Sequence, residues 1–143
     1  MNKKPALFAA SLLTALLVAA GCGNNIKVSG KVTLTDGTPV PGGRIVFISG
    51  VNQGKGNIGP DGTYRLSFQK KDDGIPPGEY VVLISGAFFK PKNLVATDEM
   101  DEGSRPMVDL KYAETETSPL TCSVPSESYN FDVEPSKVYL DDK

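Results

Sequence analysis

The chain has 143 residues, a formal net charge of −2 and no histidine, and this length fits one domain once an export segment is removed. The absence of histidine excludes Ser-His-Asp triads, Cys-His pairs and metal sites built on imidazole. The slightly acidic charge disfavours nucleic acid as a partner, because proteins that bind it neutralise phosphates with clustered lysine and arginine.

The N-terminal segment is typical of a bacterial export signal. Lys3 and Lys4 precede an almost entirely apolar run over residues 6–20, which suits a signal peptide and is shorter than the ~20 residues that span a bilayer. Small residues then lead to Cys22, a pattern that resembles the bacterial lipobox, except that Ala19 stands where leucine is most typical. We expect Cys22 to carry acyl chains such as palmitate. The alternative is an ordinary signal peptide that leaves Cys22 as a free thiol.

Lipidation at Cys22 would fix the chain to a membrane of the cell envelope. Two or more acyl chains anchor a protein stably where one does not, since each buried methylene contributes about 0.8 kcal/mol. We expect residues 1–21 to be removed as the signal peptide and residues 22–25 to form the lipidated tether. In double-membrane bacteria an aspartate after the cysteine retains a lipoprotein at the inner membrane, so Gly23 favours the outer membrane.

Beyond the tether, apolar residues alternate with a period of two, which is typical of β-strands and not of helices. The expected strands cover residues 26–34, 44–49, 55–58, 64–69, 79–85, 120–124 and 129–133. Gly30 interrupts the first apolar row, which indicates a bulge or a close approach of two backbones. Glycine, proline and aspartate mark turns between most of the strands, as in Pro60-Asp61-Gly62.

This pattern predicts an all-β fold, a single antiparallel Greek-key β-sandwich of about seven strands over residues 26–134. The nearly continuous apolar run over residues 44–49 indicates a strand that is covered on both faces or central in its sheet. Residues 87–119 are less regular, and we expect a long excursion there with at most a short strand or one turn of helix. Residues 135–143 form the C-terminal tail, whose last part, from Val138, either adds a short edge or frays.

Turn glycines, prolines and aromatic residues recur in these strands and turns. The segments are residues 28–34 (Val-Ser-Gly-Lys-Val-Thr-Leu), 36–40 (Asp-Gly-Thr-Pro-Val), 42–47 (Gly-Gly-Arg-Ile-Val-Phe), 59–64 (Gly-Pro-Asp-Gly-Thr-Tyr) and 77–80 (Pro-Gly-Glu-Tyr). Together they resemble the carboxypeptidase regulatory-like domains, and the closing segments at 111–112, 117–121 and 130–133 resemble the end of small lipoproteins of planctomycete-like bacteria. The resemblance implies a transthyretin-like (prealbumin-like) sandwich and a noncatalytic extracytoplasmic module.

Three aromatic residues form a candidate contact for a partner. Phe88 and Phe89 follow the strand expected at 79–85, and Tyr112 lies further along the same irregular stretch. Exposed apolar side chains that gather in this way mark a contact with a partner or with the membrane surface. The alternative is that one or both phenylalanines cap the core of the sandwich.

An acidic cluster is a second candidate site, with weaker support. It comprises Asp98, Glu99, Asp101 and Glu102. Carboxylate oxygens are the ligands that Ca²⁺ prefers, and paired carboxylates can act as general acid and base. The spacing is not that of an EF-hand, however, and charged loops of this kind are most simply solvated. We therefore expect no metal site, with calcium as the alternative.

Cys122 would be the single free thiol of the lipidated chain. It shares its alternation face with Leu120 and Val124, and a buried free cysteine behaves as a small hydrophobic residue. We expect a position in the core; the alternative is a nucleophilic or redox role.

Together these features favour a lipid-anchored, extracytoplasmic binding or interaction module of the cell envelope, which is not an enzyme and holds no cofactor. Its expected partners are the membrane, through the anchor, and an envelope protein or glycan, and not nucleic acid. The alternatives are a structural envelope protein and, on the acidic cluster alone, a calcium-binding protein or a carboxylate-dependent enzyme.

Overall fold

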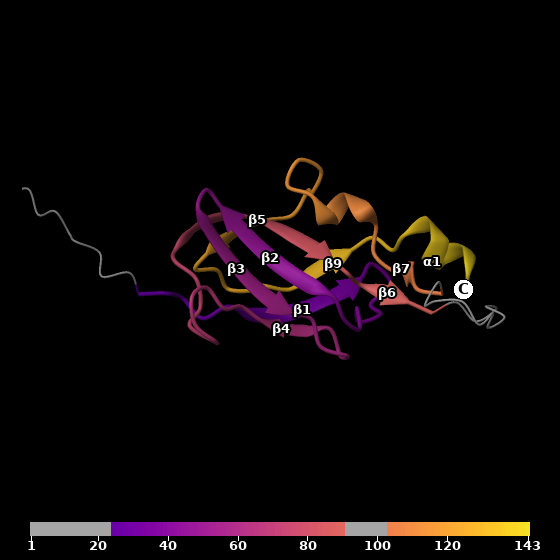
Figure 1. Ribbon diagram of the computed structural model, residues 1–143, viewed down its shortest axis with the longest axis horizontal. Coiled ribbons are helices and arrows are strands. Elements are labelled where there is room, and N and C mark those ends of the chain that lie inside the picture. The colour runs from indigo at the N-terminus through magenta and orange to yellow at the C-terminus, as the bar shows by residue number, and fades with distance from the viewer. Residues whose placement is uncertain (1–23, 91–102) are drawn as a thin grey trace, which may run out of the picture.

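The computed structural model describes residues 24–90 and 103–143, and the regular secondary structure in them is mainly β-strand, joined by loops (Figure 1). The strands are β1 (Ser29–Leu34), β2 (Arg44–Ser49), β3 (Asn52–Asn57), β4 (Thr63–Arg65), β5 (Gly78–Ser85), β6 (Phe88–Phe89), β7 (Arg105–Pro106), β8 (Thr121–Val124) and β9 (Phe131–Val133). The helical segments are the 3-10 turn η1 (Leu110–Ala113) and the helix α1 (Lys137–Asp141). The prediction of an all-β chain is therefore confirmed.

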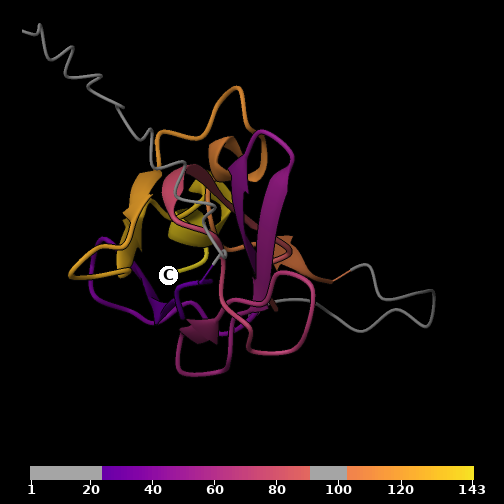
Figure 2. The same cartoon turned by 90° about the vertical axis from the view of Figure 1, so that its left-hand side faces the viewer.

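Most of the strands form two sheets. β3, β2, β5 and β8 make a four-stranded antiparallel sheet in that order, and β4, β1 and β9 make a three-stranded sheet. β6 and β7 pair separately. Figure 2 shows β1 (indigo) on one side of the molecule and β2 with β3 (purple) on the other. The buried side chains of both sheets belong to one hydrophobic core, so the arrangement is sandwich-like.

One strand pairing departs from the predicted antiparallel arrangement, because β9 runs parallel to β1. The chain reaches β9 over residues 125–130 from β8, which belongs to the other sheet. A tight hairpin would make the two strands that it joins antiparallel, but a connection between two sheets does not, so tertiary contacts decide the direction of β9. The Lys31 backbone N–H donates to Asn130 Oδ1 at 2.9 Å, and the Thr33 hydroxyl donates to Asp132 Oδ1. These hydrogen bonds join the two strands in the parallel direction.

The core is centred on Phe47 of β2, whose side chain is fully buried. Its ring centroid lies 5.9 Å from that of Phe131 in β9 and 6.5 Å from that of Tyr64 in β4. A third ring, Tyr80 of β5, lies 6.0 Å away. Since these partners belong to both sheets, Phe47 links the two layers through aromatic contacts of favourable tilted and edge-on geometry.

Strand β2 coincides with the predicted strand over residues 44–49 and is central, between β3 and β5. β3 begins three residues earlier than predicted, because its buried positions are Gly54 and Gly56, which no hydrophobic pattern marks. A Cβ atom at Gly54 would lie 2.2 Å from Ile75 Cγ2. The glycines therefore leave room for side chains from the neighbouring loop. Because glycine is not hydrophobic, these positions also show no alternation of apolar and polar residues from which this part of the strand could be predicted.

The end of the chain forms helix α1, so the prediction that residues from Val138 add an edge or fray is wrong. Ser136 is buried, and its hydroxyl accepts the Tyr139 N–H at 3.1 Å as a helix N-cap and donates to the Pro106 carbonyl. A helix this short is not stable by itself, and the N-cap hydrogen bond contributes to its stability. The Tyr139 ring then packs edge-on against Phe89, with centroids 4.9 Å apart.

In residues 87–90 and 103–119, the described part of the stretch predicted to be irregular, the only regular elements are β6, β7 and η1, as expected. Two contacts attach η1 to the end of β9. Lys111 Nζ lies 2.7 Å from Glu134 Oε2, and the Glu134 N–H donates to Tyr112 Oη at 3.1 Å. Tyr112 is consequently buried in the core.

Candidate functional site

Two predicted sites lie outside the described residues. These are Cys22 and the acidic cluster of Asp98, Glu99, Asp101 and Glu102. Within residues 24–90 and 103–143, no group of three or more carboxylate or thiol side chains could hold a metal ion. The candidate sites described below are therefore surfaces of the folded body.

The three aromatic residues predicted as a partner contact separate in the structure. Phe88 is 55% exposed, whereas Phe89 packs against Tyr139 and the core. Tyr112 is only 3% exposed, so its inclusion in a contact surface is wrong, because η1 turns its ring inward. The alternative that one phenylalanine caps the core thus applies to Phe89 and leaves Phe88 at the surface.

Leu110, which the sequence did not single out, replaces Tyr112 beside Phe88. Its side chain is 69% exposed. Leu110 and Phe88 line a hollow of about 110 Å³ together with Ala87, Pro106 and Ala113. Its lining residues come from β6, β7, η1 and their neighbours, and Figure 1 shows β6 and β7 near the end of the molecule opposite the indigo start of the described chain.

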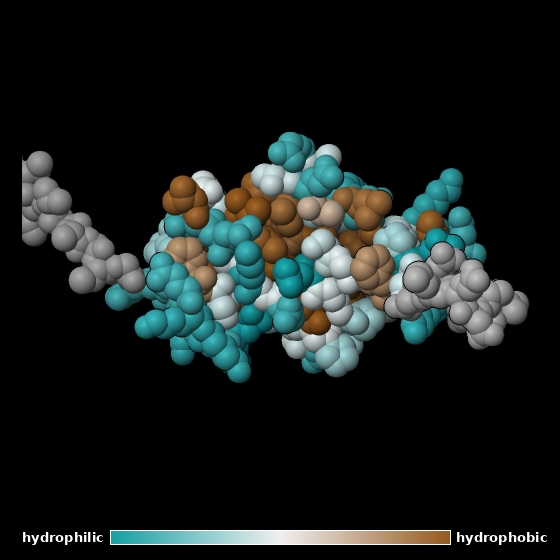
Figure 3. Space-filling model, viewed as in Figure 1, coloured by the Kyte–Doolittle hydropathy of each residue, from teal (hydrophilic) through white to brown (hydrophobic). Residues whose placement is uncertain are grey.

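A row of apolar side chains lies on the outer face of the four-stranded sheet, and we call it the sheet-face patch. It comprises Val46 and Ile48 of β2 with Leu83 and Val81 of β5, which stand directly opposite one another. Val46 is only 9% exposed, and the other three side chains are half-buried. Their neighbours in the strands, such as Phe47 and Val82, point into the core. Figure 3 shows apolar side chains gathered over β2 and β5 on this face.

Polar residues border the sheet-face patch on both sides. On β3, Lys55 and Gln53 stand opposite Val46 and Ile48, and on β8, Thr121 stands opposite Val81. An apolar centre with a polar rim is the arrangement found in protein interfaces. The sequence predicted a central strand here but did not show that one of its faces would lie outside the core.

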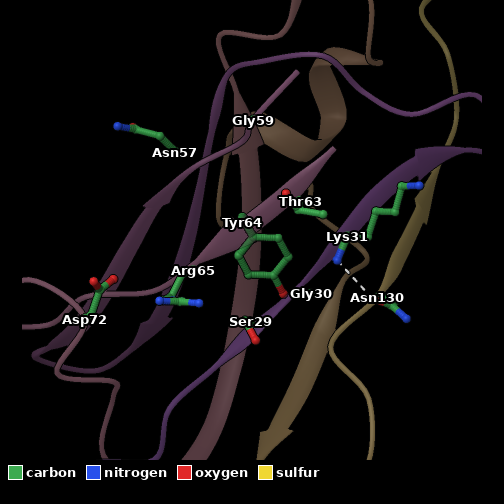
Figure 4. Close-up of a pocket in the computed structure, with 10 residues that line it drawn as sticks. All are labelled: Ser29, Gly30, Lys31, Asn57, Gly59, Thr63, Tyr64, Arg65, Asp72 and Asn130. Carbon is green, nitrogen blue, oxygen red and sulfur yellow. Dashed lines mark hydrogen bonds between the residues drawn. The ribbon is translucent and has the colours of Figure 1, made fainter. Parts of the chain in front are cut away.

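A broad, open polar groove with a volume of about 740 Å³ runs along the three-stranded sheet (Figure 4). Its principal side chains are Ser29 and Lys31 of β1, Thr63 and Arg65 of β4, Asn57 at the end of β3, Asp72 and Asn130. On the sheet, Ser29 pairs with Arg65 and Lys31 pairs with Thr63. Since alternate residues of a strand share a face, all four side chains project from the same surface.

The two cations of the groove are not neutralised by an ion pair. In the described part of the chain, ion pairs join Lys111 to Glu134 and Lys143 to Asp36, and neither pair includes Lys31 or Arg65. Figure 4 shows Arg65 extending towards the side where Asp72 lies and Lys31 extending the opposite way. The positive charges are thus spread along the groove.

Asp61 lies near Lys31 but is held by its own turn. Its Oδ1 accepts the Thr63 hydroxyl at 2.6 Å and the Thr63 N–H at 3.1 Å. These two hydrogen bonds, with a smaller contribution from the charge of Lys31, lower the pKa of the Asp61 carboxyl. Asp61 therefore stabilises the turn before β4 and leaves Lys31 available to a ligand.

Asp73 holds the loop that carries Asp72 into the groove. Its carboxylate accepts three backbone N–H groups, those of Phe68 at 2.6 Å, Gln69 at 2.9 Å and Lys70 at 2.8 Å. These three hydrogen bonds lower the pKa of the Asp73 carboxyl, and the bond from the Phe68 N–H has the largest effect. Because the pKa is lower in the folded state, the stabilisation is present above the ordinary aspartate range and is lost as pH falls through the folded pKa.

Replacing Asp73 with asparagine is expected to loosen this loop without unfolding the sheets. The amide can offer only one acceptor oxygen to three N–H donors, so at least one donor loses its partner. We expect the amide hydrogens of residues 68–70 to exchange several times faster with solvent, as measured by hydrogen exchange at neutral pH. The change Asp141→Asn at the end of α1 is the control, and exchange in the loop that stayed at the wild-type rate would contradict this role of Asp73.

Cys122 lies opposite Tyr80 in the pairing of β5 with β8 and packs, half-buried, against the core. Burial, and to a smaller extent the charge of Glu79, raises the pKa of the Cys122 thiol. A raised pKa lowers the thiolate fraction and with it the reactivity. The structure thus favours the packing interpretation of Cys122 over the redox one.

The groove and the sheet-face patch were both missed by sequence reasoning. The sequence does show the residues that build these two surfaces. The polar positions of β1 and β4 build the groove, and the apolar run of β2 builds part of the sheet-face patch. No signal in the sequence shows which strands become neighbours, and both surfaces arise from that pairing.

Comparisons with family models, curated proteins and solved structures found no match to this chain. Among the described residues, no helix is long and apolar enough to cross a membrane. The functional inference therefore depends on the surfaces described above.

Proposed function

We propose that the chain is a lipid-anchored, noncatalytic interaction module of the cell envelope that binds an envelope protein through the sheet-face patch. The observation that carries this proposal is the outer face of β2 and β5, where the half-buried Ile48, Val81 and Leu83 lie beside the largely buried Val46 and point away from the core. A contiguous apolar row with a polar border is a surface that a protein partner can cover.

The anchor in this proposal is an acylated Cys22, with residues 1–21 removed and the outer membrane as the location. The body would follow almost directly, since Ile26 already pairs with Ile75. Figure 1 places the indigo segment that leads into β1 towards one end of the long axis and β6, β7 and α1 towards the other. An anchored molecule would thus present Phe88 and Leu110 away from the membrane, with the sheet-face patch along its flank.

The finer fold assignment is also a proposal. We propose that the two sheets form a transthyretin-like Greek-key sandwich of the carboxypeptidase regulatory-like kind. The sandwich-like core shared by β1, β2, β5 and β9 supports it.

The anchor is tested by mass spectrometry of the native protein from its own membrane. The N-terminal peptide is expected to begin at Cys22 and to carry a diacylglycerol with its acyl chains. An unmodified residue 22, or an intact N-terminal segment, would contradict the anchoring part of the proposal and leave the sheet-face patch to be judged separately.

Replacing Leu83 with lysine is expected to abolish partner binding while the sheet stays folded. The lysine stem can lie along the sheet, but its ammonium group would be desolvated under a bound partner. With a photo-crosslinking residue at Ile48, the wild-type chain should give a discrete crosslinked protein in cells. Leu83→Lys should lower its yield by about tenfold or more, since the loss of an interface contact commonly costs over 1.4 kcal/mol.

Val51 provides the matched control for this experiment. It lies in the turn between β2 and β3 and is 98% exposed, so Val51→Lys adds the same charge away from the patch and should leave the yield unchanged. Equal yields from Leu83→Lys and the wild type, or equal losses from both variants, would contradict the proposed site.

A further inference from the structure

The polar groove does not stand alone, because hollows extend it at both ends. One hollow of about 200 Å³ adds Lys27 and shares Ser29, Arg65 and Asp72 with the groove. Another, of about 340 Å³, adds Arg44 and shares Asn57. The three hollows therefore lie next to one another between the start of β1 and the beginning of β2, and we call them together the basic trough.

The charge of the basic trough is opposite to that of the protein. Its lining contains four cations, Lys27, Lys31, Arg44 and Arg65, and one carboxylate, Asp72, whereas the whole chain carries a net charge of −2. A surface dominated by one sign of charge attracts ligands of the other sign. The distribution thus favours an anionic ligand.

The spacing of the cations indicates an extended ligand. Lys31 and Arg65 extend to opposite sides of the central groove (Figure 4), while Lys27 and Arg44 lie in the separate end hollows. A single small anion could contact only some of these groups. A chain that carries a negative charge at intervals could contact them in turn.

The remaining lining side chains indicate what kind of chain this is. Hydroxyl and amide groups in the lining can form hydrogen bonds with a hydroxyl-rich ligand. They belong to Ser29, Thr63, Asn57 and Asn130. The aromatic ring in the lining, Tyr64, is 4% exposed and offers no face for stacking, which disfavours single-stranded nucleic acid, since that is bound by base stacking.

We propose that the basic trough binds an acidic polysaccharide, a chain of sugars that carry carboxylate groups. Each carboxylate would accept charge-assisted hydrogen bonds from a lysine or arginine, and the sugar hydroxyls would bond the amide and hydroxyl side chains between them. This site lies on the three-stranded sheet, and its function depends on neither the lipid anchor nor the sheet-face patch.

The test measures binding of polygalacturonate to the immobilised full-length protein, with uncharged dextran as the comparison ligand. We expect binding of polygalacturonate alone, and a large loss of affinity when sodium chloride is raised from about 50 to about 200 mM, because such contacts are screened by salt. The double variant Lys31→Gln with Arg65→Gln should bind at least about tenfold more weakly, since each charge-assisted hydrogen bond contributes on that scale.

Matched variants separate the trough from the overall charge of the protein. Lys137→Gln removes an exposed cation from α1 and should change the affinity little. Asp72→Asn removes the carboxylate of the lining and should strengthen binding severalfold, and asparagine tolerates the positive φ of 58° at this position. Glu116→Gln, on an exposed loop, should have little effect, and so should Leu83→Lys.

Three outcomes would overturn the proposal. The first is equal loss of affinity in the double variant and in Lys137→Gln. The second is equal binding of dextran and polygalacturonate. The third is binding of phosphatidylglycerol vesicles that depends on Lys31 and Arg65 while polygalacturonate does not bind, which would assign the trough to the membrane surface.

Discussion

Replacing Phe47 with alanine is expected to lower the free energy of unfolding by about 3–5 kcal/mol, the usual cost of truncating a fully buried phenylalanine. The side chain is 0% exposed and contacts the rings of Tyr64, Tyr80 and Phe131. These three rings come from strands of both sheets, so the neighbours cannot collapse into the cavity without moving the sheets relative to each other. A loss at the upper end of the range is therefore expected.

Urea unfolding followed by circular dichroism measures this effect. The loss matters because a domain of this size is stabilised by only about 5–15 kcal/mol in total. Val51→Ala, in an exposed turn, should change the unfolding free energy by less than about 0.5 kcal/mol. A loss for Phe47→Ala as small as that of the control would show that Phe47 does not link the two layers.

Replacing Gly30 with alanine is expected to destabilise the three-stranded sheet by about 2–3 kcal/mol, the scale of overpacking in a tightly packed site. A Cβ atom at Gly30 would lie 2.0 Å from the Tyr129 carbonyl oxygen. The same oxygen accepts the hydroxyl of the buried Tyr64 at 2.6 Å. The backbone must move to relieve the clash, and Tyr64 then loses its partner, which adds the cost of an unsatisfied buried hydroxyl.

Gly59→Ala is the matched control for Gly30→Ala. Its added Cβ atom would lie 3.3 Å from Asp61 Oδ1 and 3.4 Å from the Thr63 carbonyl oxygen, so a small shift of a few tenths of an ångström relieves the contact, whereas the 2.0 Å approach at Gly30 requires the Tyr129 backbone to move. The unfolding free energy of Gly59→Ala should stay within about 1 kcal/mol of the wild type. Similar losses in the two variants would indicate that the close backbone approach at Gly30 has no special role.

The predictions made from the sequence succeeded where local alternation decides the structure. The apolar row of Val32 and Leu34 is buried, β2 has the predicted bounds, and Gly30 marks a close backbone approach. They failed where the determinant is a distant residue. Helix α1 depends on Ser136 bonding to Pro106, and Tyr112 is buried because its hydroxyl is bound to Glu134, 22 residues away.

The sequence by itself determined that the chain is all-β, because the period of two fixes which side chains of each strand share a face. Only the tertiary structure decided which faces meet. Strand pairing places Val46 beside Leu83 and Lys31 beside Thr63, and it sets β9 parallel to β1. These partners are far apart in the chain, and no local propensity encodes them. Both surfaces proposed to bind ligands therefore exist only once the sheets have formed.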